Sequence, residues 1–222
     1  MEQELITYLK EFVSPARRQL FEKVVADRTR YATLVIEDLY QPHNISAVLR
    51  SCDCFGVQDI HVIENRNEYI ENPEIAMGSS KWLNVVRHQK RPDNTRRTLK
   101  ELKADGYRIV ATTPHTNDVM LDDFDVQAGK FALVFGNEKE GISDDVRAEA
   151  DEFLRIPMYG FTESFNISVS AALCLQHVAQ QMRKLQVPWQ LTSEEKNEIL
   201  LVWLRRTIKN SPLIEERFRA ER

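Results

Sequence analysis

The sequence predicts an α/β fold, in which helices cover a parallel β-sheet and short helical extensions lie at both ends of the chain. Residues 31–63 carry a strand, a helix ended by Gly56 and a second strand, the order of a βαβ unit. Residues 130–135 (KFALVF) are apolar on both faces, as is typical of a central strand in a parallel sheet. Helical patterns precede residue 31 and follow residue 186.

The first half of the chain carries clear local signals for helices and strands. Ser14 followed by Pro15 predicts a helix start, because serine caps an N-terminus and proline suits the first helical position. Gly56 and Gly106 predict helix ends, and β-branched residues mark the strands. The expected elements are helices at 2–12 and 16–27, a strand at 31–36, a helix from Asn44 or Ser46 to about Cys54, strands at 59–63 and 83–87, and a helix at 95–105.

The second half continues the alternation of strands and helices. Asn166 precedes a run of small and apolar residues and predicts the start of a helix. Thr192 with Glu195 predicts a capped C-terminal helix at 194–209, followed by a short charged tail. The remaining expected elements are strands at 107–112, 130–135 and 153–156, and a helix from about Asp144.

The composition bounds the size and location of the protein. With 222 residues, 42% of them hydrophobic, the chain can form one central domain at 31–186, with a helical extension at 1–30 and another at 187–222. Apolar runs fall well short of the ~20 residues of a membrane span, and the N-terminus does not resemble a secretory signal. Three cysteines, an odd number, indicate a reducing compartment, and the pair Cys52 and Cys54 without a second pair disfavours a zinc site. We therefore expect a cytoplasmic protein without metal or membrane association.

The charge distribution leaves a nucleic-acid interaction open. The net charge of −4 does not by itself indicate a nucleic-acid binder. Residues 81–108, however, hold nine Lys and Arg, including Lys90 and Arg91, against three acidic residues, and a second basic group lies within 17–30. Local basic patches attract phosphate backbones whatever the net charge is. The alternative is an ordinary solvated helix face.

Three polar loops follow predicted strands, at the sheet edge where open α/β folds bind ligands. The first leads to Asn44 and Arg50, and we expect these two residues on roughly the same side of a helix. The second, residues 136–143, has two glycines that let the backbone approach a ligand, and it contains Glu138. The third, residues 154–173, places Ser164 and Asn166 before a helix rich in small residues. Ordinary capping and strand structure are the alternative interpretation of each loop.

Taken together, the motifs resemble a known family. They read N-x-x-x-x-x-R (44–50), G-x-E-x-x-G-[IV] (136–142) and I-P-M followed by S-x-N-x-S-x-[AS] (156–170). In this order the chain resembles the SPOUT superfamily of S-adenosyl-L-methionine-dependent RNA methyltransferases, and within it the SpoU/TrmH family of ribose 2′-O-methyltransferases. The resemblance runs from about Tyr31 to Gln180.

The resemblance implies more than the residues show on their own. It implies a sheet whose C-terminal part forms a deep trefoil knot, and a homodimer with the active site near the subunit interface. It implies cofactor contacts at Thr112, Gly136, Ile156 and Phe165. It implies catalysis by Arg50, supported by Asn44, Glu138, Ser164 and Asn166. The family mechanism casts Arg50 as the base; because an arginine side chain keeps its proton in proteins, the weaker version is that Arg50 clamps the phosphate and stabilises the oxyanion.

The substrate class follows from the extensions. Short helices at both ends, rather than a separate RNA-binding domain, resemble the branch that methylates guanosine 18 in the D-loop of tRNA, and rRNA is the alternative substrate. A non-catalytic RNA-binding protein or chaperone is a second alternative, which the presence of Asn44 and Arg50 disfavours. A nicotinamide-dependent oxidoreductase is disfavoured because the first strand lacks the glycine fingerprint of dinucleotide binding.

Overall fold

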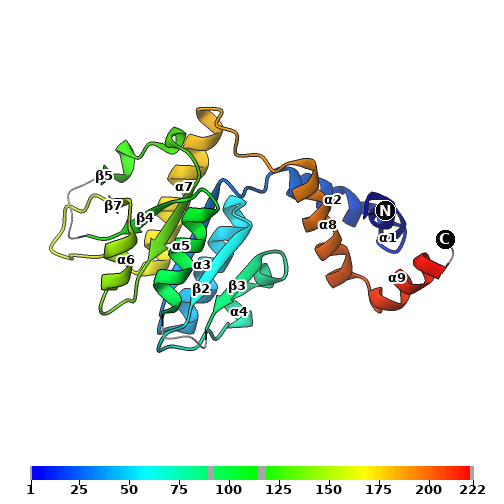
Figure 1. Ribbon diagram of the computed structural model, residues 1–222, viewed down its shortest axis with the longest axis horizontal. Helices are drawn as coiled ribbons and strands as arrows, with labels where there is room; N and C mark the ends of the chain where they lie inside the picture. The colour runs from blue at the N-terminus through cyan, green and yellow to red at the C-terminus, as the bar shows by residue number, and fades with distance from the viewer. Residues whose placement is uncertain (1, 90–92, 115–118, 221–222) are drawn as a thin grey trace. The chain divides into compact units, whose positions relative to one another are not determined.

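The computed structural model describes residues 2–89, 93–114 and 119–220, which form two compact units (Figure 1). The larger unit, Arg30–Trp189, contains the β-sheet. The smaller unit combines residues 2–29 with residues 190–220 and is helical. The functional domain limits expected from the sequence, 1–30, 31–186 and 187–222, stay a prediction.

The sheet of the larger unit confirms the predicted α/β fold with parallel strands. Within the described residues every strand pair is parallel, and the strand order is β3-β2-β1-β6-β4-β7-β5. Sequence-distant strands lie side by side at the centre, where Leu34 of β1 is opposite Leu133 of β6. The strands are β1 (Ala32–Glu37), β2 (Asp59–Ile63), β3 (Asn84–His88), β4 (Arg108–Thr112), β5 (Val119–Met120), β6 (Phe131–Phe135) and β7 (Glu152–Arg155).

Helices bury both faces of this sheet. One face packs Leu34 and Leu133 against side chains of α3 (Pro42–Phe55) and α7 (Ile167–Lys184). The other packs β-strand residues such as Val134 against α5 (Asn94–Ala104) and α6 (Asp144–Glu149). Every residue of β1 and β6 is buried, which explains why β6 is entirely apolar and β1 is apolar apart from Thr33 and Glu37.

Local signals place most helix ends, and one expected start is wrong. Gly56 and Gly106 both adopt left-handed backbone conformations, with φ of 82° and 86°, at the ends of α3 and α5. The helix expected to begin at Asn44 or Ser46 begins at Pro42 instead. Proline there is the first helical residue, where its missing N–H would have had no partner within the helix. As a result, Asn44 lies inside the first turn of α3.

The smaller unit contains one helix more than expected. Its helices are α1 (Glu2–Lys10), α2 (Pro15–Ala26), α8 (Ser193–Thr207) and α9 (Ser211–Ala220). Ser14 caps α2, and Thr192 with Glu195 forms the predicted capping box of α8. The expected charged tail is instead α9, whose Phe218 contacts Tyr8 with ring centroids 5.1 Å apart. The charged residues of this segment made it read as a tail, although one of them, Glu215, is buried and pairs with Arg205 (2.6 Å).

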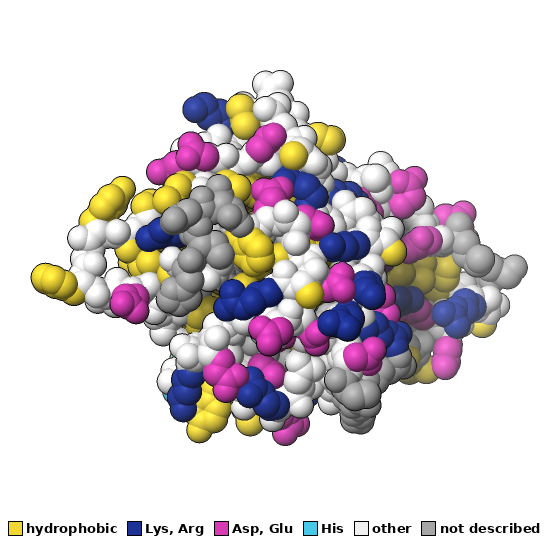
Figure 2. All heavy atoms as spheres, turned by 60° about the vertical axis from the view of Figure 1, so that its left-hand side comes forward, with side chains coloured by type: hydrophobic (Ala, Val, Ile, Leu, Met, Phe, Trp, Pro, Cys, Tyr) yellow, Lys and Arg dark blue, Asp and Glu magenta, His cyan; other side chains and the backbone are white. Residues whose placement is uncertain are grey.

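Ion pairs neutralise most of the basic run at 81–108. Arg96 pairs with Asp145 (2.8 Å), Lys103 with Asp151 (3.0 Å) and Arg87 with Glu64 (2.6 Å). Lys90 and Arg91 lie outside the described residues. Figure 2 shows Lys and Arg side chains interspersed with Asp and Glu on the face that it presents. This run therefore matches the alternative interpretation, a solvated face of mixed charge.

Two further observations bear on the classes of protein considered. No helix within 2–89, 93–114 or 119–220 has the length and apolar content to cross a bilayer. In those same ranges, no three His, Cys, Asp or Glu side chains gather as a possible metal site.

Candidate active site

A pocket of about 430 Å³ lies where the central strands end. Its walls come from the loops after β1, β4, β6 and β7 and from the first turns of α3 and α7, so all three polar loops of the sequence meet there. The volume is in the range of small-molecule sites. The pocket-lining residues that the sequence singled out are Asn44, Thr112, Gly136, Glu138, Ile156, Ser164, Phe165 and Asn166.

A chain of hydrogen bonds joins the three motifs at the pocket wall. The Asn44 amide donates to Glu138 Oε1 (2.8 Å), and the Asn166 amide donates to Asn44 Oδ1 (3.1 Å). Asn166 Oδ1 in turn accepts the backbone N–H of Ser168 (2.9 Å) and so caps α7. The helix starts of α3 and α7 and the loop after β6 are thereby held in one arrangement, with Asn44 only 6% exposed at its centre.

Glu138 is held as an acceptor. Besides Asn44, its carboxylate accepts the backbone N–H groups of Tyr40 (3.1 Å) and Gln41 (3.4 Å). Desolvation at the pocket wall would raise the pKa of Glu138, but these hydrogen bonds outweigh it and lower the pKa below its ordinary value. Glu138 is therefore ionised near neutral pH and fixes the loop that leads into α3.

The loop after β6 folds back on itself around Gly136. Asn137 and Gly141 exchange two backbone hydrogen bonds of 2.9 Å, which closes the loop into a tight turn. A Cβ on Gly136 would lie 2.2 Å from the carbonyl oxygen of Gly141, so glycine is required there for the chain to pass. The turn presents its backbone to the pocket, as expected for a loop that holds a ligand through main-chain groups.

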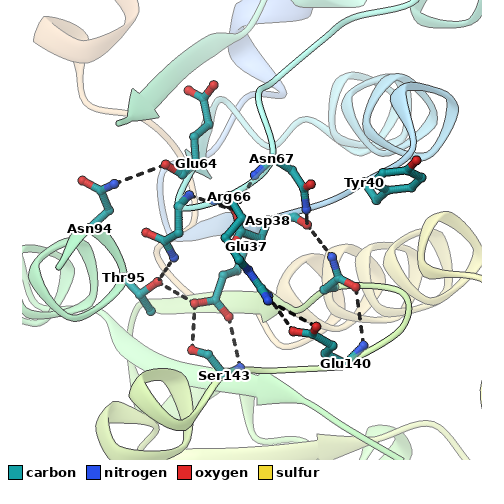
Figure 3. Close-up of polar contacts among 12 residues, drawn as sticks. Glu37, Asp38, Tyr40, Glu64, Arg66, Asn67, Asn94, Thr95, Glu140 and Ser143 are labelled. Atoms are coloured by element: carbon teal, nitrogen blue, oxygen red, sulfur yellow. Dashed lines mark hydrogen bonds and ion pairs between the residues drawn. The ribbon is translucent and has the colours of Figure 1, made fainter. Parts of the chain in front are cut away.

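Sequence reasoning missed the residue that organises these loops, Asp38. Asp38 is buried and has a left-handed backbone with φ of 53°. Its carboxylate accepts the backbone N–H groups of residues 65–67 at 2.8 to 3.2 Å, and its carbonyl accepts the side-chain amides of Asn67 (2.8 Å) and Asn137 (2.6 Å) (Figure 3). Asp38 thus ties the loop after β2 to the loop after β6.

Two more acidic residues in Figure 3 hold the β6 loop, Glu37 at its far end and Glu140 in its middle. The buried carboxylate of Glu37 accepts the Ser143 hydroxyl (2.8 Å) and its backbone N–H (3.1 Å), and it also accepts the Thr95 hydroxyl. Arg66 pairs with Glu140 in the middle of the turn and lowers the pKa of that carboxyl. Two consecutive acids, Glu37 at the end of β1 and Asp38 directly after it, were the available sequence signal.

The remaining predicted contact residues line the opposite wall. The Thr112 hydroxyl donates to the carbonyl of Val134 (3.0 Å), so this side chain is engaged within the sheet. Ile156 follows β7 and is half-buried, and Phe165 is 42% exposed beside Asn166. This geometry is consistent with contacts to a ligand through the main chains of Thr112 and Ile156.

Arg50 is the predicted site residue that the structure does not bring into this pocket. Its side chain is exposed, does not line the cavity, and makes no hydrogen bond or ion pair with the described residues. The expectation that it lies on the same side as Asn44 is wrong. Six residues turn a helix by about 600°, which leaves the two side chains roughly 120° apart and about 9 Å apart along the axis.

Comparisons with known proteins identify the family of the chain. Residues 31–176 match the SpoU rRNA Methylase family. A tRNA (guanosine(18)-2′-O)-methyltransferase from Borreliella burgdorferi is 37% identical over 210 residues, which cover 95% of this chain and 94% of the relative. The crystal structure of the A. aeolicus TrmH/SpoU tRNA modifying enzyme is similar with a TM-score of 0.77 and 28% identity, covering 88% of this chain and 98% of that one.

A more distant structure shares the fold. The SpoU methyltransferase AviRb from Streptomyces viridochromogenes, in complex with AdoMet, has a TM-score of 0.60 and 24% identity over 72% of this chain and 61% of its own.

Proposed function

Since the chain belongs to the SpoU methylase family, we propose that it transfers a methyl group from S-adenosyl-L-methionine to the ribose 2′-hydroxyl of guanosine 18 in tRNA. The observation that carries this proposal is the Glu138–Asn44–Asn166 chain, which joins the three family motifs at one pocket. The tRNA substrate is favoured over rRNA because the similarity to the tRNA enzyme covers 95% of the chain and so includes the helical segments outside the sheet unit.

The pocket fits the proposed cofactor. Gly136 leaves no room for a side chain, so a ligand there meets backbone N–H and C=O groups of the turn. Leu154, Ile156 and Phe165 provide apolar surface for a planar base on the other wall. When bound, S-adenosylmethionine supplies an activated methyl group on a sulfonium. The loops at 136–142 and 154–167 would hold it, with Thr112 beside them.

The protein's own task is to prepare the ribose hydroxyl. A 2′-hydroxyl is a weak nucleophile near neutral pH, so its proton must be shared and its oxygen held in line with the methyl group. We assign the orientation of the ribose to Ser164 and Asn166. Arg50 grips the target phosphate and stabilises the developing oxyanion, because its forked donors suit both groups. Glu138 and Asn44 position the first turn of α3 for this step.

Arg50 can serve the reaction if it comes from a second copy of the chain. In its own subunit it faces solvent on α3, away from the pocket. The neighbouring α7 exposes Val169 and Leu173, 44% and 40% exposed, beside the half-exposed Phe165. Covering this apolar face favours dimerisation. We therefore propose a homodimer in which Arg50 of one subunit completes the pocket of its partner.

Mixing two inactive variants tests the dimer. Arg50→Ala lacks the arginine, and Gly136→Val blocks the turn that holds the cofactor. If the arginine acts across the interface, a heterodimer of the two variants has one intact site. The Arg50→Ala subunit supplies the pocket with Gly136, the Gly136→Val subunit supplies Arg50, and activity returns. Activity that stays at the level of the separate variants, although the mixed dimer is isolated, would contradict this arrangement.

Two further features belong to the proposal. The loop after β7 is proposed to form part of a deep trefoil knot, because it meets the β6 turn across the pocket although β4 separates the two strands in the sheet. The helices α1, α2, α8 and α9 are proposed to contact tRNA outside the target loop. An enzyme that acts on tRNA works where tRNA is found, which places this protein in the cytoplasm.

A methylation assay with labelled cofactor tests the reaction and the substrate. Unmodified tRNA transcripts and rRNA fragments are compared, and the products are digested to nucleosides. The proposal predicts 2′-O-methylguanosine from tRNA. Label in rRNA alone would assign the alternative substrate, and RNA binding without any transfer would favour the non-catalytic class.

A further inference from the structure

Tyr40 presents an aromatic ring at the rim of the pocket. It lies on the loop between β1 and α3, and its side chain is 62% exposed, while Leu39 before it is buried. The neighbouring residue, Gln41, lines the pocket. Figure 3 shows the ring directed away from the polar contacts around Asp38 and Glu140.

The backbone around this ring is held firmly. The Tyr40 N–H donates to Glu138 Oε2 (3.1 Å), so the residue is tied to the same carboxylate that holds Asn44. Two residues earlier, the contacts of Asp38 fix the start of the loop, and two residues later Pro42 begins α3. A ring on a fixed loop loses little conformational entropy when a ligand packs on it.

A cation accompanies the ring. The Lys139 Nζ lies 5.1 Å from the centroid of the Tyr40 ring, and Lys139 itself lines the pocket. An aromatic face beside a flexible ammonium group is the combination with which proteins hold unstacked nucleotides, the ring taking the base and the cation a phosphate. Isolated exposed tyrosines are ordinary on protein surfaces, so the position beside the Glu138–Asn44–Asn166 chain carries the argument.

The reaction requires such a surface. A ribose hydroxyl reaches a pocket between loops only if its nucleotide leaves the stack of its neighbours, and the unstacked base then needs a new partner. We propose that Tyr40 and Lys139 form the subsite for the target nucleotide, with the Tyr40 ring stacked on the target base and the Lys139 ammonium on the adjoining phosphate. This inference rests on the proposed methylation of RNA.

Replacing the ring tests the subsite. Tyr40→Leu removes the aromatic face and keeps an apolar side chain, and Tyr40→Phe keeps the ring as a matched control. Stacking on one base predicts a KM for tRNA about 5- to 150-fold higher for Tyr40→Leu, and a KM near wild type for Tyr40→Phe. The Kd for S-adenosylmethionine should change less than about twofold for both variants, since neither alters the backbone of the β6 turn. A Tyr40→Leu variant with the wild-type KM for tRNA would overturn the subsite.

An abasic substrate identifies which base is stacked. For a tRNA that keeps the ribose but lacks the base at the target position, the KM of the wild type should rise as much as the substitution Tyr40→Leu raises the KM for intact tRNA. The KM of Tyr40→Leu should be the same for the abasic tRNA as for the intact tRNA. A second loss of similar size would show that the ring serves something other than the target base and would overturn the proposal.

The two proposals fail differently. If the wild type transfers no methyl group to intact tRNA, the proposed function fails and the subsite with it. If the wild type is active and Tyr40→Leu equals it, only the subsite fails. For Lys139→Gln we expect a higher KM for tRNA and a weaker dependence of that KM on salt, because one phosphate contact is lost. An unchanged salt dependence would contradict the phosphate contact of Lys139.

Discussion

The tight turn at Gly136 allows a quantitative prediction for Gly136→Ala. The added Cβ would lie 2.2 Å from the oxygen and 2.3 Å from the carbon of Gly141, and 2.4 Å from the nitrogen of Ile142. Ordinary contacts need roughly 3.5 Å, so the backbone of residues 141–142 must move by about 1 Å. That movement breaks the two 2.9 Å hydrogen bonds between Asn137 and Gly141.

The cost falls on cofactor binding. Two hydrogen bonds at about 1 kcal/mol each amount to about 2 kcal/mol. Because the turn must re-form when the cofactor binds, the free energy of binding becomes less favourable by this amount. This free energy corresponds to a Kd about 30-fold higher for S-adenosylmethionine. Isothermal titration calorimetry measures it directly. The β6 strand stays paired on both sides, so we expect unfolding to stay cooperative, with a free energy of unfolding lower by up to about 2 kcal/mol.

Gly160→Ala is the matched control. Gly160 lies in the loop after β7, and a Cβ there would come no closer than 4.0 Å to a neighbouring atom. The same change of glycine to alanine should therefore leave the cofactor Kd within about twofold of the wild type. A Gly136→Ala protein with a wild-type Kd would refute the argument that this turn holds the cofactor.

Three further predictions concern single side chains. Arg50→Ala should lower kcat by about 100-fold or more and leave the cofactor Kd within about twofold, because Arg50 is assigned to the RNA phosphate and the developing oxyanion and not to the cofactor. An equal loss in both would contradict this role. Asn44→Asp places a second carboxylate against Glu138 and should lower kcat about 100-fold while raising the pKa of Glu138, which NMR titration measures. Burial, and then the adjacent His88, lower the pKa of His61 to about 4. Below its ordinary pKa of 6.5 the unfolded chain binds the proton first, so the free energy of unfolding should fall by about 2 kcal/mol from pH 7 to pH 5 in urea titrations, and by less in His61→Gln.

The sequence predicts those parts of the fold that local chemistry determines. Ser14, Thr192 and Asn166 cap helices as expected because each side chain bonds to an N–H two or three residues away. Strand β1 was recognisable from the β-branched residues Thr33, Val35 and Ile36, which favour strands. Strand β5 was missed because its two residues form a strand only through pairing with β7.

The sequence was sufficient to name most residues of the candidate site, but not to predict which of them contact one another. Asn44, Glu138 and Asn166 were singled out from motifs that lie far apart in the chain, and the structure brings them into one chain of hydrogen bonds. Asp38 was missed because its partners, residues 65–67, approach it only in the folded protein. Arg50 was placed on the wrong side of its helix because six residues were taken as nearly two full turns, whereas they leave the two side chains roughly 120° apart around the axis.

The most direct test of the central claim is methyl transfer to two tRNA transcripts that differ in one oxygen. One carries an ordinary guanosine at position 18 and the other 2′-deoxyguanosine, so that the proposed acceptor atom is missing from the second. With labelled S-adenosylmethionine and wild-type protein, our account predicts label in the first transcript and none in the second. Equal label in both would show that the methyl group goes to another atom and would contradict 2′-O-methylation at this site.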